Sequence, residues 1–342
     1  MSTSSIDSIS AVIMLCLLCT AVSGCSNQDS HALSDVGDDF EVLSNIDFVE
    51  NNRYRAFDAS DRYLVWAELF FNSIFIYDLD SRDLIHEISL TTGQGPGEVE
   101  SIMDVRILGD STVVINDVMQ SRIISININD LSINTISFPA AVAQRLIPVH
   151  DGYVFSAMSA PDGVVAYWDG QAEEANMLAT ESEDIIPEFA NYMLRQGRLT
   201  RIGDKAVFST KYLARHFIYD LSSMTFVKHI EYEVSEMDGA DVVVDAEGRQ
   251  MHVPPSQGNM LFHGSTAYPG SIDQIVMLLE GEGEYGSYAR DVLYVYDIET
   301  EQFVDEIRLP SSAHAVVSNS SSVFIYSEND YTIYEYRPSV ES

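Results

Sequence analysis

Short strands that recur in a fixed order constrain the fold of this chain more than any other feature of its sequence. β-Branched and aromatic runs alternate with turns of Asp, Asn, Gly and Ser, and no long helical periodicity interrupts them. The third strand of the recurring unit is the clearest, and it is predicted at 74–79, 123–128, 164–169, 217–221, 293–298 and 332–336. Second strands precede it at 63–66, 113–116, 153–155, 206–208, 275–278 and 323–326. Six such units predict an all-β protein.

The ends of the repeat array indicate how the sheets close. Outer strands follow the third strands at 84–90, 131–138, 226–232 and 303–309, but the sixth unit stops at Arg337 with no room for one. The segment 40–43, which precedes the first inner strand near 54–58, can supply the missing strand. Such pairing closes a ring and hides a sheet edge. We therefore predict a six-bladed β-propeller at 39–338, closed by an N-terminal strand. A β-sandwich or a β-helix is the alternative, and neither needs that strand.

The N-terminus carries an export signal. The apolar run 11–22 is too short to span a bilayer comfortably and ends in small residues, as a signal-peptide core does. The following Val22-Ser-Gly-Cys25 resembles the lipobox of bacterial lipoproteins, although the leader has no Lys or Arg. The resemblance implies a signal peptide at 1–24, lipidation of Cys25, a tether at 25–38 and attachment to a membrane through the acyl chains.

The residues around the lipobox bear on destination and redox state. Cys16 and Cys19 would leave with the signal peptide, and the sulfur of Cys25 would be used in the lipid thioether, so we expect no disulfide in the mature chain. Ser26 and Asn27 are uncharged, and the resemblance then implies an outer-membrane lipoprotein of the cell envelope, facing either the periplasm or the cell surface.

The charge of the chain excludes one class of partner and points to a habitat. Asp and Glu number 53 against 18 Lys and Arg, a formal net charge of -35. Nucleic acid is therefore excluded as a partner. Self-repulsion of this size destabilises a compact state unless salt screens it. We predict a halophilic protein; an acidic exported protein from an ordinary habitat is the alternative.

The segment Thr92-Gly-Gln-Gly-Pro-Gly-Glu98 resembles a motif of the TolB-like six-bladed β-propeller lipoproteins, which are common in Bacteroidota and their relatives. With the repeats, the resemblance covers most of the mature chain and implies a fold more than an activity. The segment is no phosphate-binding loop, because no Gly-Lys-Ser/Thr follows it. We expect a tight turn between blades, with contact of Gln94 or Glu98 to a ligand as the alternative.

Long insertions are predicted on one face of the propeller, where binding sites are usual. They span 93–98, 181–198, 233–258 and 280–290. Within the second, 187–197 has the pattern of a short helix that could cover the central channel or simply pack on neighbouring loops. In the fourth, alternating Glu and Gly at 280–288 could bind Ca²⁺ through oxygen ligands; a solvated run of charge is the alternative. No other cofactor is predicted.

Several of the few Arg and His residues fall on the strands that are predicted to line the propeller axis. The candidate ligand-binding residues on these strands are Arg55, Arg145, Arg198, Arg201, His263 and His314. A cationic funnel inside an anionic shell would attract an anionic ligand, because Arg gives bidentate contacts to carboxylate or phosphate. In the alternative, these arginines join the blades by pairing with carboxylates such as Asp58 or Asp104.

These features favour a non-catalytic binding module whose partner is a small anionic molecule, a glycan or an envelope protein. Histidines are isolated, and neither a Gly-x-Ser-x-Gly elbow nor a Cys/His metal cluster occurs. The alternative function is that of a metal-dependent hydrolase or lyase of the six-bladed propeller type. Asp58, Asp104, His263 and His314 are the residues that could then serve the metal.

Overall fold

The computed structural model describes residues 40–43, 54–68, 72–95, 97–139, 143–157, 164–178, 196–211, 214–232, 241–244, 250–253, 261–282, 288–327, 329 and 331–338. The chain divides into two units, 1–36 and 37–342, and every described residue belongs to the second. The predicted signal peptide, Cys25 and the tether lie outside the described residues. In the described part of the chain, no helix is long and apolar enough to cross a bilayer.

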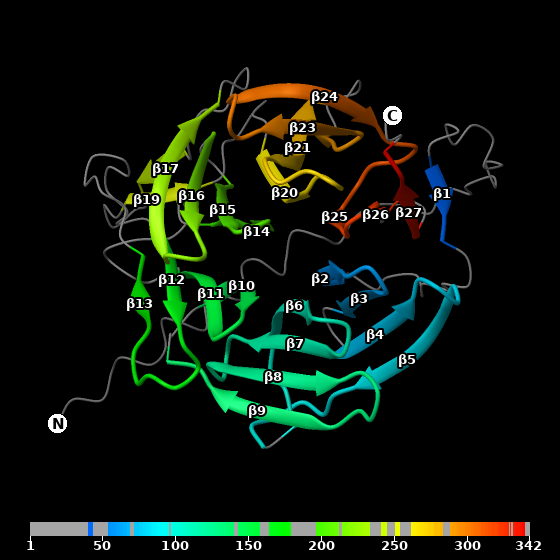
Figure 1. Cartoon of the computed structure of the whole chain (residues 1–342), viewed down its shortest axis with the longest axis vertical. Helices are drawn as coiled ribbons and strands as arrows, with labels where there is room; N and C mark the ends of the chain where they lie inside the picture. The colour runs from blue at the N-terminus through cyan, green and yellow to red at the C-terminus, as the bar shows by residue number, and fades with distance from the viewer. Residues whose placement is uncertain are drawn as a thin grey trace. The chain divides into compact units, whose positions relative to one another are not determined.

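Six antiparallel sheets, the blades, form the second unit (Figure 1). Blade 1 contains β2 (Tyr54–Ala59), β3 (Tyr63–Glu68), β4 (Ser73–Asp78) and β5 (Asp83–Ser89). Blade 2 contains β6 (Ile102–Leu108), β7 (Thr112–Asp117), β8 (Arg122–Asn127) and β9 (Ile133–Ser137). Blade 3 contains β10 (Ala143–Val149), β11 (Gly152–Ala157), β12 (Val165–Trp168) and β13 (Asn176–Met177). Blade 4 contains β14 (Gly197–Ile202), β15 (Lys205–Thr210), β16 (Arg215–Asp220) and β17 (Thr225–Glu231). Blade 5 contains β20 (Leu261–Ala267), β21 (Gln274–Glu282), β23 (Val292–Asp297) and β24 (Gln302–Arg308).

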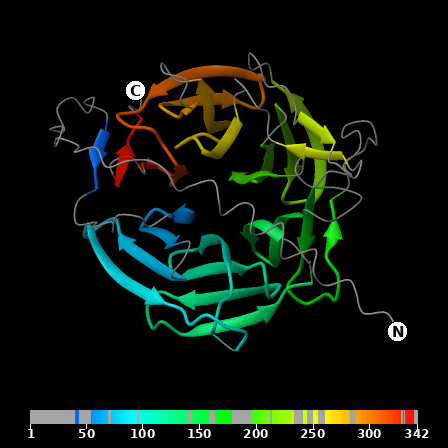
Figure 2. The same ribbon diagram turned by 180° about the vertical axis from the view of Figure 1, so that it is seen from behind.

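Blade 6 joins the two ends of the propeller. It contains β25 (Ala315–Ser318), β26 (Val323–Ser327), β27 (Thr332–Tyr336) and, as its fourth strand, β1 (Phe40–Val42). β1 pairs antiparallel with β27, so that Phe40 lies opposite Tyr336. Each inner strand contacts that of the next blade, from β2 through β6, β10, β14 and β20 to β25, and β25 contacts β2 (Figures 1 and 2). The predicted six-bladed propeller with an N-terminal closing strand is confirmed.

Two of the predicted insertions contain strands. β18 (Asp241–Val244) and β19 (Gln250–Val253) form a hairpin inside the insertion 233–258. The insertion 280–290 is shorter than predicted, because β21 continues to Glu282 and β22 (Tyr288–Ala289) pairs with it. The rest of that segment, and the predicted helix up to residue 195, lie outside the described residues.

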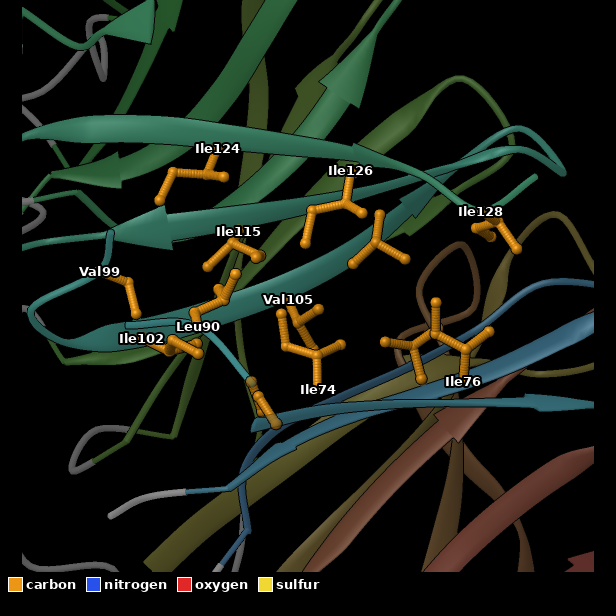
Figure 3. Packing of buried hydrophobic residues seen from close by; sticks show 14 of the residues in the cluster. Ile74, Ile76, Leu90, Val99, Ile102, Val105, Ile115, Ile124, Ile126 and Ile128 are labelled. Atoms are coloured by element: carbon orange, nitrogen blue, oxygen red, sulfur yellow. The ribbon is translucent and has the colours of Figure 1, made fainter. Parts of the chain in front are cut away.

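Apolar side chains on both faces of each blade form the cores between blades. Ile74 and Ile76 of β4 meet Val105, Ile115 and Ile124 of blade 2, and all five are fully buried (Figure 3). The opposite face of blade 1 packs on blade 6 in the same way. Burying each such side chain stabilises the fold by about 1.5–3 kcal/mol. Burial on both faces explains why the second strands are continuous apolar runs instead of alternating ones.

A repeated pair of residues ends the third strands. The first is a fully buried tyrosine in three blades: Tyr77, Tyr219 and Tyr296. The second caps the turn that follows: its Oδ1 accepts the backbone N–H groups two and three residues later at Asp78, Asn127, Asp169, Asp220 and Asp297. Asx turns of this kind reverse the chain without a specialised loop. The sequence repeat is thus a core anchor followed by a turn cap.

A candidate anion site on the propeller axis

The described residues line two cavities among the inner strands. One, of about 240 Å³, is lined near the starts of these strands by Met103, Gln144, Arg145, Gln196, Gly197, Arg198, Lys211 and His263. We call it the cationic cavity. The second cavity, of about 260 Å³, is lined by residues of all six inner strands, among them Asp58, Arg106, Thr200 and Ser265. Arg198 lines both cavities.

β-Bulges aim several of these side chains. The register of β6 shifts between Ile102 and Asp104, which brackets Met103, and that of β20 shifts between Phe262 and Gly264, which brackets His263. In β10 the shift runs from Ala143 to Leu146 and therefore contains Gln144 and Arg145. A bulge takes a residue out of the regular ladder and turns its side chain. Interrupted pairing at the strand starts thus supplies half of the lining of the cationic cavity.

Among the described residues, the lining of the cationic cavity carries positive charge and no carboxylate. Arg145, Arg198 and Lys211 contribute cations, and His263 contributes an imidazole. Lys211 is one of three lysines in a chain with 53 acidic residues. The chain as a whole is strongly negative, so a positively charged cavity is the reverse of what its composition alone would produce. The positive charge favours binding of an anion.

Arg145 and Arg106 share one buried carboxylate. Asp104 accepts from Arg145 Nη1 at 3.2 Å, from Arg106 Nε at 3.0 Å and from the backbone N–H of Leu146 at 2.8 Å. Burial acts to raise the pKa of Asp104, but the charges of Arg106 and Arg145 outweigh it, and the pKa lies below its usual value. The contacts from blade 3 to blade 2 have the form of the predicted latch between blades.

Asp58 makes a similar contact one blade earlier. It accepts the backbone N–H of Ile107 at 2.7 Å, and Arg106 Nη1 lies 3.5 Å from its Oδ1. Here burial dominates and raises the pKa of Asp58 from 3.8 to about 6, against the opposing effect of Arg106. The carboxyl is therefore largely neutral in mildly acidic solution and compensates less of the arginine charge there.

Arg198 has no such carboxylate. Its Nε donates to the backbone carbonyl of His263 at 3.3 Å, and among the described residues no Asp or Glu lies within ion-pair distance of its guanidinium. Burial, and then the neighbouring charge of Arg145, lower the pKa of Arg198 well below its usual value. Because Arg198 is a partly buried cation with like charge beside it, an anion in the cationic cavity would stabilise its charged form.

The predicted site residues divide between the two cavities. Arg145, Arg198 and His263 come together in the cationic cavity. Arg201 is exposed near the end of β14, donates to the carbonyl of Gly203 at 3.1 Å and lines the second cavity, as does His314. Five of the six candidates thus line one or the other of these two cavities, and Arg198 lines both. Arg55 belongs to β2, but its side chain is not among those described.

Sequence reasoning missed Lys211 and Arg106. Lys211 directly follows β15, at the turn toward the third strand, and that turn lies on the same face as the strand starts. Combining the strand prediction with the rarity of lysine could have found it. Arg106 pairs with Asp104 two residues earlier on β6 and with Asp58 across the boundary to blade 1, and no local pattern marks this second partner.

The glycine-rich segment encloses a buried arginine. Arg122 donates to the carbonyls of Gln94 and Gly95 through Nη1, at 3.2 and 3.1 Å, and to those of Gly93 and Glu98 through Nη2, at 3.0 and 2.5 Å. The carboxylate of Glu98 turns inward and accepts the N–H of Gly95 at 2.6 Å. A Cβ on Gly95 would lie 2.9 Å from that carboxylate, so a larger residue there would displace the Glu98 side chain. Gln94 is exposed. These contacts support the structural interpretation of the segment.

Among the described residues, no group of three His, Cys, Asp or Glu side chains is arranged to hold a metal ion. Asp58 and Asp104, which the hydrolase or lyase alternative would use, have Arg106 as a common partner. Most of the acidic segment predicted to bind Ca²⁺ has no described side chains, so Ca²⁺ stays a prediction.

The fold and the site together define a six-bladed β-propeller with a cationic cavity on its axis. Residues 47–253 match the model of a family described as a 6-bladed beta-propeller, DUF5128. The chain belongs to this family. None of the curated proteins matches it.

Solved structures show the same fold at low sequence identity. A protein of Bacteroides fragilis NCTC 9343 that is described as exported is 10% identical, with a TM-score of 0.57 over 89% of this chain and 97% of its own. A member of the DUF4221 family from Bacteroides vulgatus ATCC 8482 is 11% identical, with a TM-score of 0.56 over 87% and 98%. A catalytically inactive virginiamycin B lyase from Staphylococcus aureus, crystallised with quinupristin, is 11% identical, with a TM-score of 0.53 over 87% and 99%. At these identities the likeness is one of fold.

Proposed function

We propose that this protein is a non-catalytic, lipid-anchored binding module of the cell envelope that holds a small anionic ligand in the cationic cavity. One observation carries the proposal: Arg145, Arg198, Lys211 and His263 line the same cavity in a chain of net charge -35. Cations that are concentrated in one cavity repel one another, and this repulsion is costly in the empty protein. A bound anion would remove that cost and add charge-assisted hydrogen bonds.

The two arginines of the cationic cavity differ in their carboxylate partners, and this difference supports a binding role. Arg145 is compensated by Asp104, whereas Arg198 has no carboxylate among the described residues. A purely structural set of arginines would be expected to be paired throughout, because an uncompensated buried charge destabilises the fold. We therefore expect Arg198 to contact the anion directly. Arg145 adds positive charge beside it.

The envelope location rests on the N-terminal sequence. The lipobox-like segment ending at Cys25, the uncharged Ser26 and Asn27, and the resemblance of residues 93–98 to TolB-like lipoproteins support an outer-membrane anchor. Host cells grown with a labelled fatty acid should incorporate the label into the wild-type protein and not into Cys25→Ser. Equal labelling of both proteins, or labelling of neither, would contradict the anchor.

Anion binding is tested on the processed lipoprotein in detergent. Thermal melting is measured at constant ionic strength and pH 7 with inorganic phosphate, acetate, D-glucuronate and, as a neutral reference, D-glucose. We expect at least one anion to raise the melting temperature and glucose to leave it unchanged, since a ligand that binds only the folded state stabilises it. Arg198→Gln and Lys211→Gln should lose the effect.

The two other lysines provide matched controls. Lys205 pairs with Asp273 and Glu299 between blades, and Lys228 pairs with Glu301, so neither lines the cationic cavity. Lys205→Gln and Lys228→Gln remove the same charge as Lys211→Gln but should keep the anion effect. If all three variants respond alike, or if no anion raises the melting temperature, the axial site is wrong. Chelator-sensitive turnover of a lactone or ester would favour the metal-dependent hydrolase or lyase instead.

A further inference from the structure

We infer that the cationic cavity selects a carboxylate that also carries hydroxyl groups, that is, a sugar acid or a hydroxy acid of similar size. The inference rests on the proposed function and names the chemical class of the anion. Three features of the lining carry it: the orientation of one guanidinium, the two amide side chains beside the cations, and the volume of the cavity.

The guanidinium of Arg198 is suited to a planar anion. Its Nε is engaged by the carbonyl of His263 at 3.3 Å, and among the described residues its two terminal nitrogens donate to no acceptor. This edge of the guanidinium is a planar fork that matches the two oxygens of a carboxylate. Arg145 cannot offer the same edge, because its Nη1 is used by Met103 O at 3.0 Å and by Asp104 at 3.2 Å.

Two glutamines flank the cations in the lining. Gln144 directly precedes Arg145, Gln196 lies two residues before Arg198, and all four residues line the cavity. An amide both donates and accepts hydrogen bonds, and so does a hydroxyl group. The oxygens of phosphate are mainly acceptors, so phosphate would offer few hydrogen-bond donors to the amide carbonyls. Against a ligand with several hydroxyl groups, both ends of each amide have partners.

The volume of the cavity limits the ligand. About 240 Å³ is slightly below the range of about 300–1,000 Å³ that is common for small-molecule pockets. A single sugar ring or a short hydroxy acid is of suitable size, whereas an oligosaccharide could enter only by its end residue. Acetate would leave most of the lining without contact.

Isothermal titration calorimetry on the full processed lipoprotein tests the inference at pH 7 and constant ionic strength. D-Glucuronate, acetate, inorganic phosphate and D-glucose are compared. We expect D-glucuronate to bind about tenfold tighter or more than acetate or phosphate, the gain from one or two additional hydrogen bonds. Glucose should not bind measurably, since it lacks the charge.

Variants separate the two contributions to D-glucuronate binding. Arg198→Lys keeps the positive charge but loses the fork, and we expect it to weaken D-glucuronate binding about tenfold. Gln196→Met removes the amide at nearly constant volume. The affinity for D-glucuronate should fall toward the affinity for acetate, and the affinity for acetate should stay unchanged. Gln302→Met, on the exposed outer strand β24, is the matched control and should bind as the wild type does.

The outcomes distinguish this inference from the proposed function. If phosphate binds and D-glucuronate binds no better than acetate, the anion site stands and the hydroxy-acid inference is wrong. If none of the anions binds, the proposed function also fails. The comparison of ligands on the wild-type protein decides the inference even where a variant does not fold.

Discussion

Replacing Arg122 with alanine is the sharpest test of how the glycine-rich segment is held. Arg122 begins β8, and its guanidinium donates to four backbone carbonyls of the segment 93–98. Its Nε also pairs with Asp117 at 3.1 Å, and the two side chains are only 9% and 0% exposed. Asp117 in turn accepts the backbone N–H groups of Glu100 and Ser101 at 3.0 and 3.1 Å, just before the next inner strand. One arginine thus ties the connection between blades 1 and 2 to a turn of blade 2.

The magnitude follows from these contacts. Removing one partner of a buried ion pair costs about 3–5 kcal/mol, because the other charge is left uncompensated. Asp117 keeps its two backbone donors and the freed carbonyls can meet water, so we expect about 3–4 kcal/mol. The entropy of unfolding is about 2.1 cal/mol/K per residue, or about 0.6 kcal/mol/K for a propeller of roughly 300 residues. The melting temperature of Arg122→Ala should therefore fall by about 5–6 °C.

Differential scanning calorimetry at constant salt measures this shift. Arg62→Ala is the control, because Arg62 is 52% exposed and its buried partner Asp78 keeps two backbone N–H donors when the guanidinium is removed. Such pairs contribute about 0–1 kcal/mol, so the control should melt within about 2 °C of the wild type. Arg122→Lys should recover only part of the loss, since an ammonium cannot reach all the carbonyls. A shift for Arg122→Ala no larger than that of the control would refute the reasoning.

Three further predictions concern pH, salt and ring closure. Asp58 holds its proton up to about pH 6 when folded but only to about 3.8 when unfolded, so it favours folding in acid and loses this contribution as the pH rises. The stability of the wild type relative to Asp58→Asn should thus fall by up to about 3 kcal/mol between about pH 4 and 7 in denaturant titrations; a constant difference would contradict the raised pKa. The melting temperature should rise from dilute buffer to about 1 M NaCl, where the Debye length is about 3 Å, and an unchanged value would count against a halophilic protein. Arg82 bridges Glu41 of β1 and Glu335 of β27 at 3.5 and 2.8 Å. Arg82→Ala should speed amide exchange in β1 but not in blade 3, and uniform exchange rates would rule out this role.

Much of the fold could be predicted from local sequence. The third strands end in an aromatic or aliphatic anchor and a carboxylate or amide cap, and both act within a few residues of their own position. Such short-range signals survive without knowledge of the fold. The closing strand was predictable for a different reason: the last repeat lacked an outer strand, and pairing of an N-terminal strand with the last blade closes the ring of a propeller.

The candidate site was predictable only in part. The rarity of Arg and His on inner strands identified Arg145, Arg198 and His263, which do share a cavity. It also grouped Arg201 with them, although that side chain is exposed and lines the second cavity. The alternation of side chains along a strand does not predict where along the propeller axis a residue lies. That position depends on the register of each blade relative to its neighbours.

By itself, the sequence determined that the chain is a closed ring of six blades, because strand periodicity, turn caps and the incomplete last repeat are all local properties. Only the tertiary structure decided which cations meet. The bulges at the starts of β6, β10 and β20 turn single side chains toward the axis, and nothing in the strand pattern marks them. Packing between blades places Asp104 beside Arg145. Among the described residues, it places no carboxylate beside Arg198. That difference arises between residues far apart in the chain, and the proposed anion site depends on it.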